Sequence, residues 1–251
     1  MHQNTLRVSV VSYINSLPFI YGLENYTGPK AFSIEKDIPS VCAQKLLDGS
    51  IDVGLVPVAI LPLLHQPQLL TKYCIGADGE VGSVLLLSEV PLEEIKTVLL
   101  DFHSRTSVQL VQVLFREHWK QTPTWKAAEA DFISHIKGTT AAVVIGDRTF
   151  ELKNRFAYSY DLAQAWKKFT GLPFVFAAWV ANKKLTDEQL DHFNAAIEYG
   201  ISNIQEVINQ LNQQKIPGLN ASQYLTENIQ YNFDDQKRQG LQLFLNYLQS
   251  Y

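Results

Sequence analysis

The segment Leu6-Arg7-Val8-Ser9-Val10-Val11-Ser12-Tyr13-Ile14-Asn15-Ser16 places an apolar run directly before a polar loop. Residues 6–11 are typical of a buried strand, and residues 12–16 are typical of the loop that follows one. Pro18 suits the first turn of a short helix over residues 17–23. These elements form the first half of an α/β unit.

The second half of this unit lies between residues 38 and 56. Ile38-Pro39-Ser40 is predicted to begin a helix that runs to Leu47, and Gly49 is predicted to end it. Residues 51–56 are apolar except for Asp52, as in a buried parallel strand. The order of strand, loop, helix and strand predicts an α/β fold.

The same unit returns 89 positions later, where Ser104 stands in place of Asn15 and Gly138 in place of Gly49. A period this long is too large for a solenoid repeat and predicts two similar lobes. The expected elements are a strand over 95–100, a loop over 101–105, a helix over 106–119, a helix over 132–137 and a strand over 141–145.

Two segments, 76–87 and 171–181, are placed to cross between the lobes. Residues 158–161 are expected to form a loop, and residues 166–169 a helix. The tail begins with Thr186-Asp187-Glu188-Gln189, which matches a capping box, and apolar residues follow at helical spacing to Leu211. A last helix is predicted from about Asp234. The tail helices lack strand partners, so we expect them to pack on the first lobe.

These patterns predict a two-lobed α/β protein with two hinge crossings and a central cleft. The expected division assigns residues 1–86 and 178–251 to lobe I, and residues 87–177 to lobe II. The length of 251 residues suits two lobes of this size.

The bulk composition is that of an ordinary globular protein, with 46% hydrophobic and 18% charged residues. The net charge of −4 is spread along the chain, so we expect neither nucleic acid nor a membrane as a partner. Residues 1–11 lack the basic start and long apolar region of a secretory signal, which favours a cytoplasmic location. Cys42 and Cys74 are isolated and are predicted to be reduced core thiols, with a disulfide between them as the alternative.

Ligands in open α/β sheets collect in the loops after the carboxyl ends of the strands. Two facing lobes would bring such loops together at one cleft. Four loops qualify, and they are residues 12–16, Val56-Pro57, residues 103–107 and Gly146-Asp147-Arg148.

Ser104-Arg105-Thr106-Ser107 places three hydroxyls and a guanidinium at a predicted helix start. Free backbone N–H groups and the helix dipole favour an anion at such a position. Ordinary capping by Ser104 or Thr106 is the alternative, since a cap needs only one hydroxyl. Arg105 could instead be a surface side chain or form an ion pair between the lobes.

Other polar residues of these loops have two interpretations each. Asn15 suits a ligand contact, or a helix cap or Asx-turn. Asp147 and Arg148 could pair with other surface groups. His103 is a candidate general base, or simply a polar loop residue.

Several catalytic signatures are absent from the sequence, including a Walker loop, GxGxxG, HExxH, GxSxG and a carboxylate cluster spaced for a metal. The residues alone therefore indicate a hinged protein that binds a small anion, whether as an enzyme or as a non-catalytic binding or sensing protein.

Residues 49–54, Gly-Ser-Ile-Asp-Val-Gly, resemble the turn and strand of type 2 periplasmic-binding-protein folds. More specifically, the chain resembles the chorismate dehydratase family of the futalosine pathway to menaquinone over most of its length to about Asn182. The motifs that carry this resemblance are residues 11–18, 76–79 with 83–88, 104–107, 145–147 and 169–176. The opening motif differs from that of the sister family, 1,4-dihydroxy-6-naphthoate synthase.

The resemblance implies a lyase that converts chorismate to 3-[(1-carboxyvinyl)oxy]benzoate and water, without a metal or other cofactor. It places Asn15 and Ser83 at the reacting ring, where they would orient the substrate and hydrogen-bond the departing hydroxyl. A substrate carboxylate is the implied proton acceptor, and His103 leaves room for a protein base. The expected oligomeric state is a monomer or weak homodimer. The expected substrate-binding residues are Ser12, Tyr13, Pro57, Ser104, Arg105, Thr106, Ser107, Gly146 and Asp147.

Overall fold

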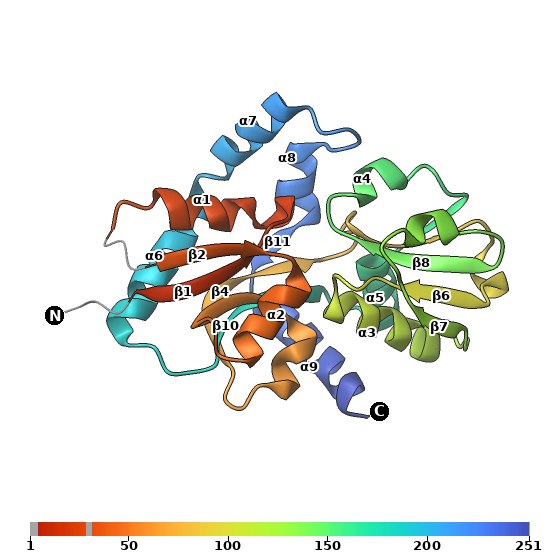
Figure 1. The fold of residues 1–251 in the computed structure, drawn as a ribbon, viewed down its shortest axis with the longest axis horizontal. Helices are drawn as coiled ribbons and strands as arrows, with labels where there is room; N and C mark the ends of the chain where they lie inside the picture. The colour runs from red at the N-terminus through yellow and green to blue at the C-terminus, as the bar shows by residue number, and fades with distance from the viewer. Residues whose placement is uncertain (1–4, 29–31, 251) are drawn as a thin grey trace.

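The computed structural model describes residues 5–28 and 32–250. They form two α/β lobes that lie side by side, each built on its own sheet (Figure 1). The six-stranded sheet of lobe I has the order β11-β4-β10-β3-β1-β2, and the five-stranded sheet of lobe II has the order β7-β6-β8-β5-β9. The predicted two-lobed α/β fold is therefore confirmed.

Lobe I contains the amino-terminal unit, the returning strand β10 and the carboxyl-terminal tail. Its strands are β1 (Leu6–Val11), β2 (Phe32–Asp37), β3 (Val53–Pro57), β4 (Gln68–Ala77), β10 (Phe174–Ala181) and β11 (Gln230–Asn232). Its helices are α1 (Leu17–Asn25), α2 (Pro39–Leu47), α6 (Asp187–Ser202), α7 (Ile204–Gln214), α8 (Ala221–Gln223) and α9 (Asp235–Gln249). Shorter turns are η1 (Ile14–Ser16), η2 (Val58–Leu63) and the π-helical η6 (Tyr224–Asn228).

Lobe II contains the middle of the chain. Its strands are β5 (Val84–Ser88), β6 (Thr97–Leu100), β7 (Thr124–Ala127), β8 (Thr140–Ile145) and β9 (Tyr158–Asp161). Its helices are α3 (Arg105–Val113), α4 (Thr149–Leu152) and α5 (Leu162–Thr170), with the short elements η3 (Leu92–Glu94), η4 (Leu114–His118) and η5 (Phe132–His135).

The strand pairing confirms the repeated unit. In lobe I, β1 pairs in parallel with β2 and β3, and β3 pairs antiparallel with β10. In lobe II, β6 pairs in parallel with β7 and β8, and β8 pairs antiparallel with β5. Because the two units share this pattern, the loops after β1 and β3 have counterparts after β6 and β8.

The chain crosses between the sheets twice. Residues 78–83 lead from β4 into β5, and residues 171–173 lead back from α5 into β10. Strand pairing thus places both crossings a few residues before the expected lobe boundaries at 86/87 and 177/178, and that division of the chain stays a prediction. Trp166 on α5 packs between Phe174 on β10 and Phe244 on α9, with ring centroids 5.3 and 6.0 Å away. An aromatic cluster therefore lies beside the second crossing.

Two local predictions were wrong. The helix expected over 132–137 is only the 3₁₀ turn η5, and the loop expected over 158–161 is the strand β9 at the edge of the lobe II sheet. Residues 158–161 are a strand because they pair with β5. The apolar stripe of the tail is helical as expected and is divided between α6 and α7 at Asn203.

Several other predictions are confirmed. Thr186 and Gln189 form the reciprocal capping box of α6, and α9 begins after Asp234. Cys42 and Cys74 are free and buried. Helix α6 packs on α1 so closely that a methyl group on Gly22 would lie 2.1 Å from the Ala196 carbonyl oxygen. The tail therefore packs on lobe I as expected, although η6 also reaches the boundary with lobe II.

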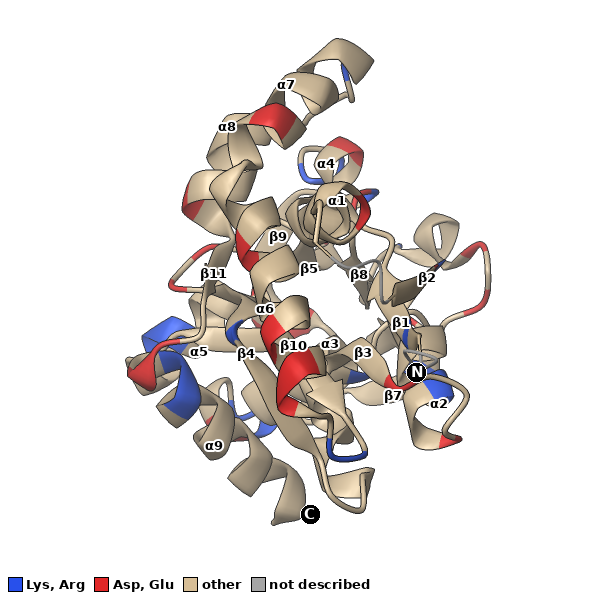
Figure 2. Cartoon of the chain, turned by 90° about the vertical axis from the view of Figure 1, so that its left-hand side faces the viewer, with Lys and Arg blue, Asp and Glu red and all other residues tan. Residues whose placement is uncertain are grey.

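The charged residues visible from the side of lobe I are scattered, with acidic residues along α6 (Figure 2). Among the described residues, no helix has both the length and the apolar character needed to cross a membrane.

Candidate functional site

A cavity of about 530 Å³ lies between the two lobes. Its walls are the strand-end loops of both lobes together with residues of the first crossing segment and of β10. The lining residues are Val11, Tyr13, Asn15, Ser16, Pro39, Leu55, Pro57, Ile75, Val81, Ser83, Val84, Ser104, Thr106, Ser107, Ile145, Gly146, Phe176 and Ala177. The structure therefore brings Asn15, Ser83 and Ser104 to one shared cavity.

Eight of the residues expected at the site line this cavity, namely Tyr13, Asn15, Pro57, Ser83, Ser104, Thr106, Ser107 and Gly146. Ser12, Arg105 and Asp147 do not line it. Ser12 is exposed, and its N–H donates to the carbonyl of Asp37 at 2.9 Å. The lining supplies hydroxyl and amide groups against an apolar wall, and none of the described residues that line it has a charged side chain.

The hydroxyls at the start of α3 come from the second lobe. The Ser104 side chain caps the helix by accepting from the Ser107 N–H at 2.9 Å, and the two hydroxyls are also 2.9 Å apart. The Thr106 hydroxyl accepts from the Ala59 N–H of lobe I at 3.2 Å. Ordinary capping by Ser104 is thus real. It leaves the first backbone N–H groups of α3, at Arg105 and Thr106, without an intrahelical acceptor.

Arg105 points away from the cavity lining and joins the two lobes. Its guanidinium donates to the side-chain oxygen of Gln44 on α2 at 3.2 Å. This contact is a hydrogen bond to a neutral amide and not the ion pair that was the alternative for Arg105. A cationic partner for an anion is therefore missing from the described lining.

Asp147 links the two lobes by hydrogen bonds. Its carboxylate accepts from the Ile14 N–H of lobe I, with oxygen distances of 3.1 and 3.3 Å. Burial raises the pKa of Asp147 to about 6, and the hydrogen bond from Ile14 opposes that shift. The alternative for Asp147, pairing with other surface groups, is therefore wrong, because the part-buried carboxylate accepts from the backbone of lobe I. Its expected contact with the substrate stays a prediction.

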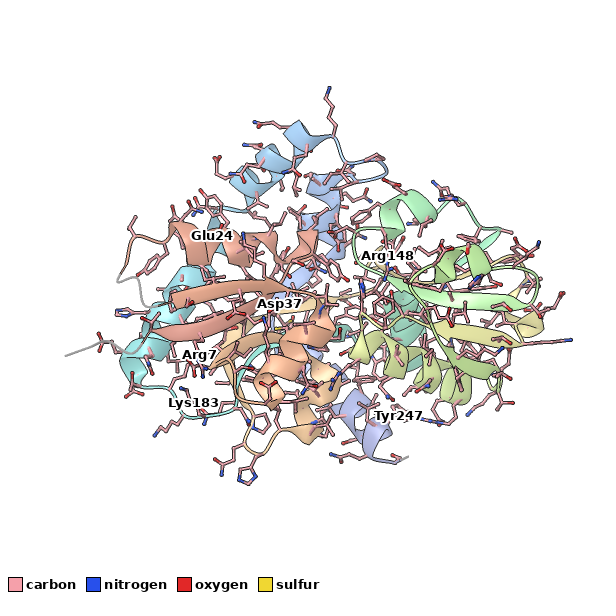
Figure 3. The ribbon with its side chains drawn as sticks, in the orientation of Figure 1. Arg7, Glu24, Asp37, Arg148, Lys183 and Tyr247 are labelled. Atoms are coloured by element: carbon pink, nitrogen blue, oxygen red, sulfur yellow. The ribbon has the colours of Figure 1, made fainter. Side chains whose placement is uncertain are left out.

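A second contact between the lobes joins Tyr13 and His103. The Tyr13 hydroxyl lies 3.0 Å from Nδ1 of His103, and the Tyr13 ring faces Gly146 so closely that a methyl group there would be 2.7 Å from its Cζ atom. Burial lowers the pKa of His103. Arg148 lies on the side of lobe II that faces lobe I and pairs with the buried Asp101 (Figure 3). His103 is therefore held between the lobes, outside the cavity lining.

Ser83 and Asn15 meet at a cluster of hydroxyls. Ser83 is only 2% exposed, and its Oγ lies 2.8 Å from the hydroxyl of Tyr224. The Asn15 side-chain oxygen accepts from the Ser16 hydroxyl at 3.0 Å, and the Asn15 carbonyl accepts from the Tyr231 hydroxyl at 2.9 Å. Burial raises the pKa of Tyr224, so this phenol stays protonated.

The segment that carries Ser83 is held by Asp161. One carboxylate oxygen of Asp161 accepts from Val81 and Gly82 at 3.0 and 2.7 Å, and the other caps α5. The Ser83 carbonyl accepts from the Gly146 N–H at 3.0 Å. These bonds fix Ser83 against the end of β8.

Several residues of the site have no local signal in the sequence. Tyr224 and Tyr231 come from the tail, which follows the last recognised motif. The tail contains no loop after a parallel strand, and such loops are where ligand-binding residues were expected. Phe176 lies in the segment expected to cross between the lobes, but its contact with the cavity depends on the position of β10 in the sheet. Only the three-dimensional arrangement brings the tail tyrosines to Ser83 and Asn15.

The fold and the cavity between the lobes define a two-lobed protein of the periplasmic-binding-protein fold. The chain is similar to a solved structure from Archaeoglobus fulgidus (TM-score 0.79, 12% identity, 100% of this chain and 98% of that chain). It is also similar to a Candida albicans protein with the generic periplasmic binding protein fold (TM-score 0.66, 13% identity, 98% and 90% covered). A third is the alkanesulfonate-binding protein SsuA of Xanthomonas axonopodis, bound to MOPS (TM-score 0.65, 14% identity, 98% and 93% covered).

Sequence comparison gives a narrower assignment. Residues 6–250 match the family described as menaquinone biosynthesis, and the chain belongs to that family. A curated relative, the chorismate dehydratase of Thermus thermophilus, is 25% identical over 258 residues, which cover 90% of this chain and 94% of the relative.

Proposed function

We propose that this protein is a chorismate dehydratase, a lyase that converts chorismate to 3-[(1-carboxyvinyl)oxy]benzoate and water. The observation that carries the proposal is that Asn15, Ser83 and Ser104 line one cavity between the two lobes. Its support is the family match and the relationship to the Thermus thermophilus enzyme over nearly the whole chain. The reaction removes the C4 hydroxyl and the C3 proton of chorismate, and formation of the aromatic ring drives it.

The proposed roles follow from the chemistry of the lining. Ser83 and Asn15 orient the ring and hydrogen-bond the departing C4 hydroxyl. The hydroxyls of Ser104 and Ser107, with the free N–H groups at the start of α3, hold a substrate carboxylate. Closing the lobes holds the substrate in one orientation and excludes water.

The C3 proton needs an acceptor inside the cavity. Because the described lining has no charged side chain and His103 lies outside it, we propose that a carboxylate of the substrate takes this proton. His103 instead supports the closed state through its contact with Tyr13.

The wider setting of this activity is also a proposal. We place the reaction in the cytoplasm, in the futalosine pathway, with chorismate as the small-molecule partner. A monomer or weak homodimer remains the predicted oligomeric state, and residues 1–86 with 178–251 and 87–177 remain the predicted lobes.

The test is turnover of chorismate by the purified protein, followed by ultraviolet absorbance and identification of the product. Ser83→Ala and Asn15→Ala should each lower kcat by about 100-fold or more, since each removes a hydrogen-bond donor at the reacting ring. Ser88→Ala is the matched control. Ser88 is a buried serine at the end of β5, the strand that follows Ser83; its hydroxyl accepts from Val90, and it does not line the cavity. Full turnover by Ser83→Ala and Asn15→Ala would overturn the proposed site.

The likeness to an alkanesulfonate-binding protein favours a non-catalytic binding protein as the second candidate. Tight binding of chorismate without any product would support that function. Conversion of the cyclic futalosine-derived substrate, with chorismate untouched, would point to the sister synthase instead.

A further inference from the structure

The tail supplies a buried phenol to the site. Tyr224 on η6 is 3% exposed, and its hydroxyl lies 2.8 Å from Ser83 Oγ although 141 positions separate the two residues. Its ring packs edge-on against Phe150 of lobe II, with ring centroids 4.8 Å apart. Tyr224 does not line the cavity, so it reaches the substrate site only through the residues that do.

The hydrogen bond between Tyr224 and Ser83 has a defined direction. The Tyr224 hydroxyl donates to Ser83 Oγ at 2.8 Å, so the Ser83 oxygen is the acceptor of this bond. Ser83 is then left with its own O–H hydrogen free, and the cavity is the space into which it can point.

We propose that Tyr224 is a positioning residue that makes Ser83 a hydrogen-bond donor toward the substrate. The hydrogen bond runs from Tyr224 to Ser83, and Ser83 lines the cavity. A leaving hydroxyl needs a donor and not an acceptor, so the direction of this bond suits the departure of the C4 oxygen. No bond is made or broken by Tyr224 itself. This inference rests on the proposed function.

The tail therefore has a role that packing on lobe I does not explain. Residues 220–228 are anchored to lobe I through β11, while Asn228 donates to the Glu80 carbonyl in the first crossing segment. The Tyr224 hydroxyl can reach Ser83 only while this segment lies against the crossing. The carboxyl-terminal part of the chain thus completes the site that the two repeated units form.

The test is a double-mutant cycle with Tyr224→Phe and Ser83→Ala, measured as kcat and KM for chorismate. Tyr224→Phe keeps the ring and should lower kcat by about 10- to 100-fold with KM nearly unchanged, as outer partners of a site typically do. In the Ser83→Ala background, Tyr224→Phe should cause no further loss, because the group through which it acts is gone.

Tyr231→Phe is the matched control. It removes the hydroxyl of another buried tyrosine of the tail, whose partner is the backbone carbonyl of Asn15 and not Ser83. Its effect should be the same factor in the wild-type and Ser83→Ala backgrounds. Unchanged kcat in Tyr224→Phe, or a loss that multiplies with that of Ser83→Ala, would overturn the inference while leaving the proposed function intact. Absence of chorismate turnover by the wild-type protein would instead overturn the proposed function.

Discussion

Replacing Gly146 with alanine should hold the two lobes apart. Gly146 follows β8 with a φ of +76°, and a methyl group on its Cα would lie 2.7, 2.8 and 3.0 Å from three carbons of the Tyr13 ring in the opposite lobe. Carbon atoms pack best at about 3.5–4.0 Å, so the ring would have to retreat by roughly 1 Å. Neighbouring contacts, including the bond between Tyr13 and His103, oppose that movement.

The expected loss has two parts that can be separated. Alanine at a positive φ costs about 1–2 kcal/mol wherever it occurs. Overlap with a packed side chain adds about 1–3 kcal/mol, and it arises only when the lobes are closed. If chorismate turnover needs the closed state, the second part lowers kcat/KM by about 5- to 150-fold.

Gly49→Ala is the matched control, because Gly49 has the same φ of +76° and nothing within 4 Å of its added methyl group. Both variants should lose similar stability to the backbone strain, measured by thermal or urea denaturation. Only Gly146→Ala should lose activity, measured as kcat/KM for chorismate. Equal activity of the two variants would refute the argument that contact between Tyr13 and Gly146 is part of the active state.

Three further predictions concern titration, the general base and the support of Ser83. The pKa of Asp147 is raised from 3.8 to about 6, so the folded state binds this proton more tightly than the unfolded state does. The resulting contribution to stability is full below about pH 4 and is lost as the pH rises through 6. The effect amounts to about 3 kcal/mol. Urea denaturation should therefore show wild-type stability falling relative to Asp147→Asn between pH 4 and 6, and a difference that does not vary with pH would contradict this. His103→Gln should keep most of its turnover, since the ring lies outside the cavity lining, whereas a loss of about 100-fold or more would assign it the role of base. Asp161→Ala should lower the free energy of unfolding by about 3 kcal/mol or more, because four backbone N–H groups lose their acceptor; an unchanged denaturation midpoint would show that water replaces the carboxylate.

The repeated unit was predictable because its signals are local. Buried parallel strands appear as apolar runs, and helices that end at Gly49 and before Pro-rich or polar loops have recognisable boundaries. Strands β2 and β7 escaped prediction for a physical reason. They lie at the sheet edges with alternating or largely exposed residues, so their sequences resemble polar loops. Their strand character comes from pairing with β1 and β6.

The loops that form the candidate site were predictable for the same reason. Polar residues after parallel strands were expected to converge, and eight of them line the cavity. The direction of an individual side chain was not predictable, as Arg105 shows: it occupies the first position of α3, yet its guanidinium contacts Gln44 on α2. The role of the tail also lay beyond local reasoning, because the contact between Tyr224 and Ser83 depends on how η6 packs between the lobes.

The uncharged lining bears directly on the proposed chemistry. A cationic side chain beside a substrate carboxylate would lower the pKa of that carboxylate and make it a weaker base. Hydroxyl and N–H dipoles can hold one carboxylate at the start of α3 without supplying a full positive charge to the cavity. Of the described residues, those that line the cavity carry no charged side chain. Under the proposed function, a substrate carboxylate that is not held at α3 therefore meets no cation in the lining and stays the stronger base, as the proposed transfer of the C3 proton requires.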